Sequence, residues 1–424
     1  MNDLPGRENG HIGLNRVVEL TLRQLGVDAV YIAELTGATA IYRGVAGDAA
    51  SFGVFLDDGR PAAATYCGRL VAGGIPGVIF DATGDERVAD LPVTREAPVG
   101  SFIGVPLRLS DGSLYGALCG VSHAPAPNLD EQDLRFMAML GELITADLDE
   151  RRREERLRGD LLGLIEREDL GVAYQPIFDL HGEDCLGIEA LARFPEPFAG
   201  PEETLAAAER LGLSLELERL VARHAWSMLP LLGRGQFLAL NVSPGALIEL
   251  ARRANLAEDL VLSQLVVEVT EHAIVECYEE LHRELTPLRR RGLRIAVDDA
   301  GAGYASLRHV LELRPDFIKV DRSLIDGIAG DHARRAAVRA FLSIALDMGS
   351  RVIAEGVEQP ADLLAVRELG LHAVQGYLLG RPSTDADTVA GWIGPQAPAI
   401  GGEQSQRRRA TFLPRRRPVR AVIR

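Results

Sequence analysis

The sequence predicts an α/β protein of two domains, a small α+β domain followed by a β/α barrel. The chain has 424 residues, more than one domain of typical size. Short strand-like runs with turn signals follow an N-terminal helix, whereas apolar runs alternate with helical stretches after residue 170. This second part spans about 240 residues, which matches the roughly 250 residues typical of an eight-stranded barrel.

The first domain is predicted to form an antiparallel sheet with flanking helices. Its clearest signal is a hairpin, because alternating apolar residues in Ser101–Leu109 and Ser113–Val121 flank the turn Ser110-Asp111-Gly112. Asp130 is a suitable N-cap for the helix that closes the domain. In chain order the predicted elements are a helix at 10–28, strands at Ala29–Glu34 and Ala40–Gly44, the hairpin, and a helix at 129–148.

The connecting segment 147–160 reads DLDERRREERLRGD. Its acids and bases fall at i, i+3 and i+4, and no Gly or Pro precedes Gly159, which favours an exposed helix. Two interpretations stay open: a solvated helical connector, or a signalling helix that pairs with its copy in a homodimer. The apolar spacing from Leu140 to Leu161 is broken in the middle and does not decide between them.

Eight strand-like runs follow residue 170, separated by segments of helical composition. Spacings of 20 to 52 residues between their polar positions leave room for a helical crossover each time. The runs are VAYQPIF, CLGIEALARF, QFLALNVS, QLVVEVTE, LRIAVDDA, DFIKVD, RVIAEG and HAVQGYLL, and the helical segments are 201–230, 274–291, 322–349 and 359–370. We therefore place a tail at 1–9, the first domain at 10–146, the connector at 147–160, the barrel at 161–395 and a second tail at 396–424.

Composition excludes several classes of protein. Apolar residues make up 47% and charged residues 25%, as in soluble globular proteins. No apolar run approaches the ~18–20 residues that span a membrane, and the N-terminus carries no evident signal peptide. The four cysteines (Cys67, Cys119, Cys185 and Cys277) form no CxxC pair or Cys/His cluster. We therefore expect reduced thiols in a cytoplasmic protein.

Charge is distributed unevenly along the chain. The net charge is −15, and removing the eight arginines that follow residue 404 leaves −23 on the remainder. A body this acidic repels nucleic acid, so we expect no specific nucleic-acid partner. A phosphodiester substrate would need metal ions or local arginines to offset the repulsion. The Arg- and Pro-rich tail at 396–424 is predicted to be disordered.

Polar side chains close almost every apolar run of the predicted barrel. Carboxyl ends of barrel strands converge on one face, where active sites lie. Several carboxylates gathered there would raise each other's pKa, and divalent cations would remove that repulsion. Oxygen ligands suit Mg²⁺ or Mn²⁺, and the lack of histidine at these positions disfavours zinc. A single residue of this kind is more often solvated or salt-bridged, but the whole set at barrel spacing indicates a site: Glu189, Asn241, Glu268, Asp298, Asp299, Lys319, Glu355 and Gln375.

The barrel region resembles the EAL domain phosphodiesterases of bacterial cyclic di-GMP signalling. The resemblance covers residues 160–392, and eight motifs in family order make it specific. They are YQPI (174–177), EALAR (189–193), NVS (241–243), EVTE (268–271), DDAGAGYASL (298–307), KVDRS (319–323), AEGVE (354–358) and QGYLLGRP (375–382).

The resemblance implies roles for the matching positions. Two metal ions, Mg²⁺ or Mn²⁺, would be bridged by Asp298. Lys319 would hold the attacking water or a phosphate oxygen, and Glu355 would act as general base. Glu271 would hold the loop after Asp299. The implied metal ligands are Glu189, Asn241, Glu268, Asp298 and Asp299, the implied substrate contacts are Gln175, Leu191, Arg193 and Gln375, and Glu358 and Asp321 would support the site from outside.

The loop DDAGAGYASL departs from the usual DDFGTGYSSL of the family. Ala300 replaces an apolar anchor and Ala302 replaces a hydroxyl, whereas Gly301 and Gly303 preserve the turn. The metal ligands are unchanged. The departure predicts a more mobile loop and a weaker second metal site rather than a different reaction.

Residues 10–148 resemble a GAF domain. The motifs that carry the resemblance are TYCGRLVAGG (65–74), VIFDATGDERVADLP (78–92) and SFIGVPLRLSDGSLYGALCG (101–120). The family predicts the fold and a pocket for a small molecule, but not which molecule. Cys67 as a chromophore attachment site and His123 as a haem ligand are possible roles, although a buried thiol and a turn histidine are the more common situations.

These observations support three functions of different classes. The first is a metal-dependent phosphodiesterase that converts cyclic di-GMP to linear pGpG, works as a homodimer and is regulated by its GAF domain. The second is a non-catalytic cyclic di-GMP receptor, which the altered loop favours. The third is an interaction scaffold. The complete ligand set, with Lys319 and Glu355 in place, favours the enzyme.

Overall fold

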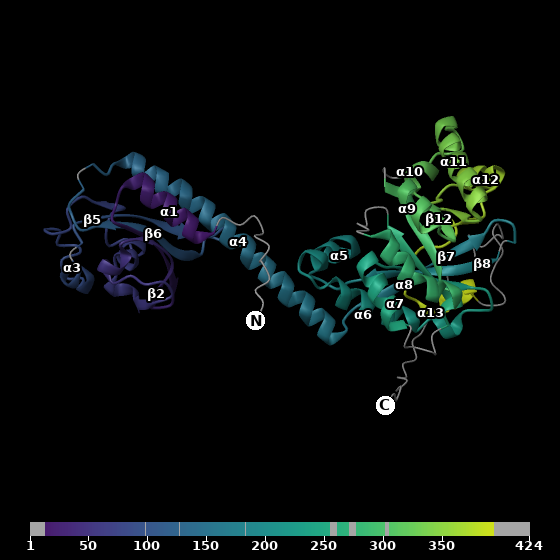
Figure 1. The fold of residues 1–424 in the computed structure, drawn as a ribbon, viewed down its shortest axis with the longest axis horizontal. Helices are drawn as coiled ribbons and strands as arrows, with labels where there is room; N and C mark the ends of the chain where they lie inside the picture. Colours follow the sequence, from purple (N-terminus) through teal and green to yellow (C-terminus); the bar gives the residue numbers. More distant parts are fainter. Residues whose placement is uncertain are drawn as a thin grey trace, which may run out of the picture. The chain divides into compact units, whose positions relative to one another are not determined.

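The computed structural model describes residues 13–97, 99–126, 128–182, 184–254, 261–270, 277–301 and 305–393. The chain divides into two compact units, Met1–Gly159 and Asp160–Arg424 (Figure 1). Within the described ranges, none of the helices combines the length and the apolar character needed to cross a lipid bilayer.

The N-terminal unit is built on one antiparallel sheet of six strands in the order β3-β2-β1-β6-β5-β4. The hairpin predicted around Asp111 is present, with Arg108 of β5 opposite Leu114 of β6. The strands are β1 (Ala29–Thr36), β2 (Thr39–Gly47), β3 (Gly59–Pro61), β4 (Val78–Ile79), β5 (Ser101–Arg108) and β6 (Leu114–Ser122), and the helices are α1 (Leu14–Leu25), α2 (Tyr66–Val71), α3 (Pro92–Glu96) and α4 (Glu131–Arg167).

Both faces of this sheet are covered. Alternation along the strands sends Tyr31 to one core and its neighbour Ile32 to the other. Ile32 packs with residues of α1 and α4, whereas Tyr31 packs with α2 and with the segments between β2 and β5. The predicted small α+β domain with an antiparallel sheet is therefore confirmed.

Helix α4 begins at Glu131, two residues after the start of the helix predicted at 129–148, and contains the rest of that helix and the whole connector at 147–160. Its first half buries Met137, Leu140 and Ile144 against the sheet. The backbone N–H of Ser110, in the hairpin turn, donates a hydrogen bond to Asp149 Oδ2 at 2.8 Å. The charged connector is thus continuous with a helix that is anchored in the N-terminal sheet.

The second unit is a closed barrel of eight strands in the order β10-β11-β12-β13-β14-β7-β8-β9. Its fold confirms the predicted barrel. The strands are β7 (Gly171–Asp179), β8 (Cys185–Arg193), β9 (Phe237–Asn241), β10 (Leu265–Thr270), β11 (Arg294–Ala300), β12 (Phe317–Val320), β13 (Arg351–Ala354) and β14 (Ala373–Val374), and the helices are α5 (Pro201–Arg210), α6 (Ser214–Trp226), α7 (Pro244–Ala254), α8 (Tyr278–Arg290), α9 (Ala305–Leu313), α10 (Arg322–Ile325), α11 (His332–Met348), α12 (Pro360–Leu369) and α13 (Ala386–Ile393).

The first strand of the barrel breaks the regular alternation that the sequence predicts. β7 runs antiparallel to both of its neighbours, β8 and β14. The expectation of a helical crossover in every unit was wrong here, because only residues 180–184 separate β7 from β8 and a parallel crossover needs a dozen or more. The hairpin pairs Gln175 with Glu189, which brings two of the expected site residues to the same level.

Side chains that point into the barrel form an apolar floor. This cluster alternates along the strands with residues that pack outward on the helices. Phe237 and Phe317 meet in its centre with ring centroids 5.2 Å apart. The floor consists of Ile177, Phe237, Ala239, Val266, Ala296, Phe317, Ile353 and Ala373. The next inward position on most of these strands is polar.

Candidate active site

One polar side chain comes from each barrel strand or from the residue directly after it. Asn241, Glu355 and Gln375 stand at or just beyond strand ends, as the sequence predicts. Glu268 lies inside β10, since it interrupts its apolar run rather than closing it. Glu189 was expected to close its run, which was wrong, because β8 continues to Arg193. Long strands keep the period of two, which turns every second residue inward. The eight are Gln175, Glu189, Asn241, Glu268, Asp298, Lys319, Glu355 and Gln375.

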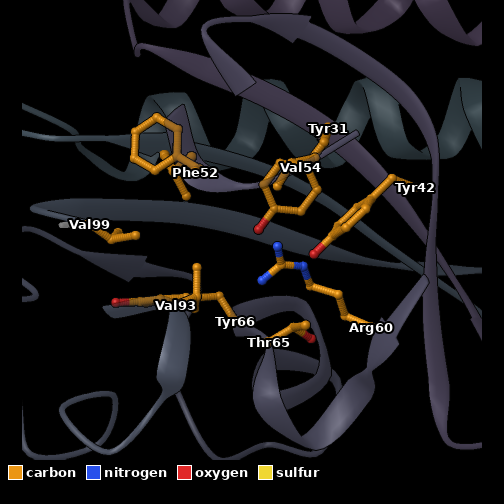
Figure 2. A pocket seen from close by; sticks show the side chains of 10 residues that line it. Tyr31, Tyr42, Phe52, Val54, Arg60, Thr65, Tyr66, Val93 and Val99 are labelled. Carbon is orange, nitrogen blue, oxygen red and sulfur yellow. The ribbon is translucent and has the colours of Figure 1, made fainter. Parts of the chain in front are cut away.

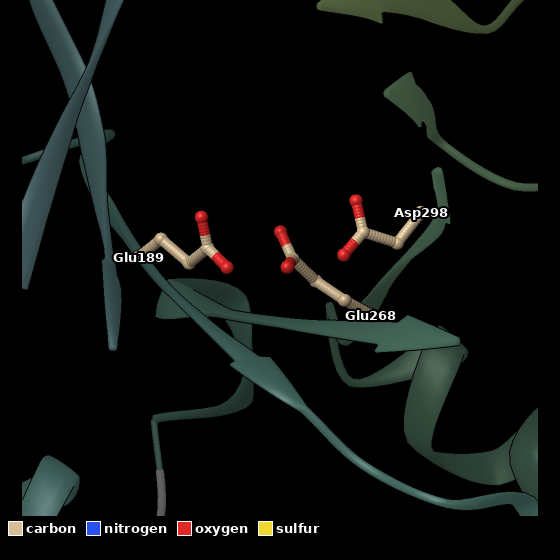
Figure 3. Close-up of side chains that lie close together, drawn as sticks. All are labelled: Glu189, Glu268 and Asp298. Carbon is tan, nitrogen blue, oxygen red and sulfur yellow. The ribbon is translucent and has the colours of Figure 1, made fainter. Parts of the chain in front are cut away.

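Carboxylates from three strands face one another in the barrel. Figure 3 shows Glu189 of β8, Glu268 of β10 and Asp298 of β11 with their oxygens turned together. One oxygen from each lies within 4.8 Å of the others, and all three residues are buried. A second group, formed by Asp298, Asp299 and Glu355, meets the same limit. Asp298 belongs to both groups, which is the arrangement that a bridging ligand of two cations requires.

The ammonium group of Lys319 lies among these carboxylates. Its Nζ is 2.8 Å from Glu268 Oε2, 2.9 Å from Asp298 Oδ1, 2.8 Å from Glu355 Oε1 and 3.5 Å from Glu189 Oε2. Lys319 is the only lysine in the sequence, against 45 arginines. A compact ammonium fits between four carboxylates, whereas a planar guanidinium demands more room. The family resemblance implies that Lys319 holds the attacking water or a phosphate oxygen, and that role stays a prediction; in the structure its ammonium group balances part of the charge of the carboxylates.

Burial and neighbouring charges shift the pKa values in this cluster. Burial, with the charges of Glu189 and Asp298, raises the pKa of Glu268 well above its usual range, although Lys319 opposes the shift. Burial and then Asp298 raise the pKa of Glu355 in the same way. Burial acts to lower the pKa of Lys319, but Asp298, Glu189, Glu268 and Glu355 outweigh it and raise that pKa well above its usual value. The site therefore holds a stable cation and carboxyl groups ready to accept protons.

Amide side chains hold Glu189 in place. Asn241 Nδ2 donates to Glu189 Oε1 at 3.0 Å, and Gln375 Nε2 donates to Glu189 Oε2 at 2.6 Å. Gln375 Nε2 is also 3.1 Å from Gln175 Oε1, and Gln175 Nε2 donates to the carbonyl of Gly380 at 3.0 Å. Gln375 Oε1 is buried and has no partner among the described residues. One acceptor thus remains available beside the carboxylates.

A cavity of about 120 Å³ lies where β8 ends, and Asn241, which donates a hydrogen bond to Glu189, lines it. Leu191 and Arg193 line it as well; their role as substrate contacts stays a prediction. Glu218 of α6 lines it as well and was not found from the sequence. Its Oε2 accepts a hydrogen bond from Ser243 N at 2.8 Å, and burial raises its pKa. An acid inside a helix carries no local signal that separates it from a surface residue; only the packing of α6 reveals this one.

Three expected residues stand apart from the cluster. Asp321 caps α10, accepting a hydrogen bond from Ser323 N at 2.9 Å. Glu358 pairs with Arg322 at 3.1 Å. Glu271 lies outside the residues that the structure describes. The first two contact α10 and not the carboxylates, so any influence on the site is indirect.

The structure describes only part of the loop DDAGAGYASL (298–307), whose sequence differs from the usual family pattern. Asp299 has a left-handed backbone with φ 54°, a region that Asp tolerates better than most residues. Ala300 is fully buried in the barrel core, and its carbonyl accepts a hydrogen bond from Asp321 N at 3.1 Å. Ala302 and Gly303 lie outside the described residues. The predicted mobility of this loop therefore stays a prediction.

The two candidate ligands of the N-terminal unit occupy ordinary positions. Cys67 is fully buried, its Sγ lies 3.1 Å from Thr65 Oγ1, and burial raises the pKa of its thiol. His123 is exposed and stacks on Phe52 with centroids 4.1 Å apart, while its Nε2 lies 2.8 Å from Ser51 Oγ. Neither arrangement provides an argument for a chromophore or a haem.

Comparisons with known proteins agree with this organisation. The model of the EAL domain family matches residues 156–382, and that of the GAF domain family matches residues 12–148. An uncharacterised signalling protein of Caulobacter vibrioides is 29% identical over 95% of this chain and 48% of its own length. A cyclic di-GMP phosphodiesterase of Pseudomonas aeruginosa is 33% identical over 51% of this chain and 38% of its own. The chain thus spans less than half the length of these curated relatives.

A solved structure of the MucR phosphodiesterase in complex with c-di-GMP is 31% identical in sequence to this chain. The match covers 55% of this chain and 99% of the MucR chain, with a TM-score of 0.49. The EAL family match spans more than half of the 424 residues and contains all eight inward polar positions. The chain therefore belongs to the EAL domain family and carries a GAF domain in its N-terminal unit.

Proposed function

We propose that the chain is a metal-dependent phosphodiesterase that opens cyclic di-GMP to linear pGpG. The observation that carries the proposal is the pair of carboxylate groups that share Asp298 and surround Lys319, beside a cavity lined by Arg193. A relative that shares 33% identity with the chain bears the name of this activity. The complete cluster also favours an enzyme over a receptor, because binding alone needs no water-activating carboxylate.

The residues suit two divalent cations. Five carboxylates and one ammonium group together carry a net charge of −4. Two divalent cations carry +4 and would balance it. The five are Glu189, Glu268, Asp298, Asp299 and Glu355, and Asn241 adds an amide oxygen. Hard oxygen donors without histidine or thiolate favour Mg²⁺ or Mn²⁺. Bound there, two cations supply Lewis-acid polarisation of the phosphodiester and of the attacking water.

The chain's own residues would perform the remaining work. Glu355 accepts the proton of the water molecule whose oxygen attacks phosphorus, and it lies beside Asp298 and Asp299 in the second carboxylate group. The bond from phosphorus to the 3′ oxygen breaks, and that oxygen takes up a proton from solvent and leaves as a hydroxyl, so the product is a linear dinucleotide with a 5′ phosphate. Arg193 binds a phosphate oxygen. The carboxylate of Glu218 accepts hydrogen bonds from the N–H groups of a guanine in the adjoining cavity.

The test is turnover of cyclic di-GMP by the purified full-length chain with Mg²⁺ or Mn²⁺, followed by chromatography of the linear dinucleotide. We expect Glu355→Gln and Asp298→Asn to lose most of the activity while the far-ultraviolet circular dichroism stays unchanged. Arg322→Met, which removes an exposed partner of Glu358, is the matched control and keeps the wild-type rate. Tight binding without turnover under either metal would establish the receptor instead.

We further propose that the GAF unit regulates the barrel through α4. The support is the continuity of this helix, which packs on the N-terminal sheet and extends to Arg167. Arg156→Pro removes a backbone hydrogen bond in its exposed part at a local cost of ~3 kcal/mol. A changed turnover rate with intact cyclic di-GMP binding supports regulation through the helix, and an unchanged rate contradicts it. Sedimentation of the same variant tests the proposed homodimer paired along α4.

A further inference from the structure

The cavity at the end of β8 is larger than the one inside the N-terminal unit. The N-terminal cavity, lined by Tyr31, Tyr42 and Arg60 among others, is about 20 Å³ and has room for about one water molecule (Figure 2). The barrel cavity is about 120 Å³ and is lined by Arg193 and Glu218 among others. Of these two spaces the barrel cavity is the one that can hold more than a water molecule, so the residues that fix its walls bear on what it binds.

One wall of the barrel cavity is the end of β8, and the start of β7 supports this wall. Residues 191–193 of β8 line the cavity. Their antiparallel partners are residues 171–173 of β7, with Gly171 opposite Arg193. A Cβ built on Gly171 would lie 3.7 Å from Arg193 Cβ, which is ordinary contact distance. Because strand pairing holds the two backbones roughly 4.7–4.9 Å apart, a displacement of residues 171–173 also displaces this wall.

Another wall of the cavity is helix α6, which contributes Glu218 and Val221. Arg223 follows Val221 by two residues and therefore lies on a different face of the helix. Its Nη1 is 2.8 Å from Glu168 Oε1, directly after the end of α4 (Figure 1). The ion pair thus joins α6 to the segment that leads into β7.

The segment between α4 and β7 is short and contains a backbone outlier. α4 ends at Arg167 and β7 begins at Gly171. Glu168 has a left-handed backbone with φ 53°, and its carbonyl accepts a hydrogen bond from Leu170 N at 3.0 Å. Glycine adopts this conformation without strain, whereas it is uncommon for other residues, so an acidic residue here points to a use for the side chain. The described contact of that side chain is the ion pair with Arg223.

Most of the carboxylate cluster depends on other strands. Glu268 and Asp298 belong to β10 and β11, and Glu355 directly follows β13. The neighbours of β7 in the barrel are instead β8 and β14. Glu189 does belong to β8, but two amide side chains hold its carboxylate separately. A displacement at the start of β7 therefore changes the cavity more than it changes the carboxylates.

We propose that Glu168 and Arg223 are positioning residues for substrate binding. Their ion pair holds α6 at the start of β7 and thereby sets the separation of Glu218 and Arg193 across the cavity. Neither residue belongs to the described lining of the cavity, so both act through the groups that do. The inference rests on the proposed function, because it takes cyclic di-GMP as the molecule that occupies the cavity.

The test is charge reversal, because neutral removal of one partner from an exposed ion pair has a small effect. Glu168→Arg, Arg223→Glu and their combination are introduced into the full-length Glu355→Gln chain, and binding of cyclic di-GMP with saturating Mg²⁺ is measured by calorimetry. Each single reversal brings like charges together, so we expect the dissociation constant to rise about fivefold. The combination restores an ion pair and should return the constant to within about twofold of the parent. Salt at about 1 M should reduce the effect of each single reversal, because it screens exposed charges.

The two reversals also separate positioning from net charge. They change the net charge in opposite directions, and long-range attraction of the anionic substrate would make Glu168→Arg bind more tightly. Positioning predicts weaker binding in both. Arg252→Glu is the matched control, because it reverses one partner of another exposed pair, with Glu280 at 2.9 Å between α7 and α8, and it should keep the parent affinity.

Turnover by the same variants with Glu355 intact gives a second readout. We expect KM for cyclic di-GMP to rise in each single reversal, while kcat stays within about twofold of the wild type. Single reversals that bind like the parent, a combination that does not restore affinity, or tighter binding by Glu168→Arg would each overturn the proposal. So would a fall in kcat with unchanged KM, which places the effect at the carboxylates. If the Glu355→Gln parent itself does not bind cyclic di-GMP, the proposed function is rejected and this role with it.

Discussion

Replacing Lys319 by methionine tests the electrostatic account of the barrel centre. Methionine preserves the length and apolar stem of the side chain but removes the charge. Lys319 is 1% exposed and lies 2.8–2.9 Å from Glu268, Asp298 and Glu355. Removing one partner of a buried ion pair costs about 3–5 kcal/mol because the other partner stays buried and unpaired. Glu268 and Glu355 have raised pKa values and relieve part of this cost by taking up protons, so we adopt about 3 kcal/mol.

The assay is thermal unfolding of the barrel by calorimetry in the presence of a chelator. For a domain of ~150–250 residues, about 3 kcal/mol lowers the unfolding temperature by about 6–12 °C. The difference should shrink with saturating Mg²⁺, because the cations then balance the carboxylates that the ammonium balanced before. Arg322→Met removes an exposed charge whose pair is worth less than about 1 kcal/mol and serves as control. If Lys319→Met unfolds at the wild-type temperature without metal, the carboxylates are not the charged, lysine-dependent cluster described above.

Four further outcomes are expected. Lys319 is the only lysine, so protein labelled at lysine gives one side-chain ammonium signal in nuclear magnetic resonance, and this signal should shift on addition of Mg²⁺; no shift means that metal binds elsewhere. Glu218→Gln should raise KM for cyclic di-GMP about tenfold with little change in kcat, since it removes an acceptor for guanine; a wild-type KM rejects that contact. Gly187→Ala should destabilise the barrel by at least about 2 kcal/mol in urea unfolding, because its Cβ would lie 2.3 Å from the carbonyl oxygen of Phe237; unchanged stability would show that β8 can shift. Burial opposes ionisation of Asp179, but hydrogen bonds from backbone N–H groups and from Arg351 lower its pKa overall. Asp179→Asn should therefore lose about 1–2 kcal/mol of unfolding free energy at neutral pH, and this loss should vanish as the pH falls below about 4. A loss of stability that persists in acid contradicts this cause.

Local patterns were sufficient to predict much of the fold. The hairpin around Asp111 follows from strand alternation and turn chemistry, both of which act within a few residues. The connector at 147–160 is helical because its charges repeat at helical spacing and no helix breaker interrupts them before Gly159. The barrel follows from eight apolar runs at crossover spacing. Its first strand was predicted less well, because the direction of a strand depends on the length of its connection and on its neighbours in the closed sheet.

The candidate site shows the same division. Its residue types could be read from the sequence, since a carboxylate or amide in an apolar strand is costly to bury and therefore conspicuous. The partners of Lys319 could not, because its four contacts come from residues that lie 21 to 130 positions away in the chain. Glu218 was missed for the same reason, because an acid in a helix is unremarkable until its surroundings are known.

The sequence by itself thus determined the two domains, the barrel class and the set of polar residues at its centre, because these depend on short-range periodicity and on the type of each side chain. Only the tertiary structure decided which charges meet and which residues line each cavity. Distance and burial control electrostatic and hydrogen-bond energies, and both are properties of segments that are remote in the chain and adjacent only after folding.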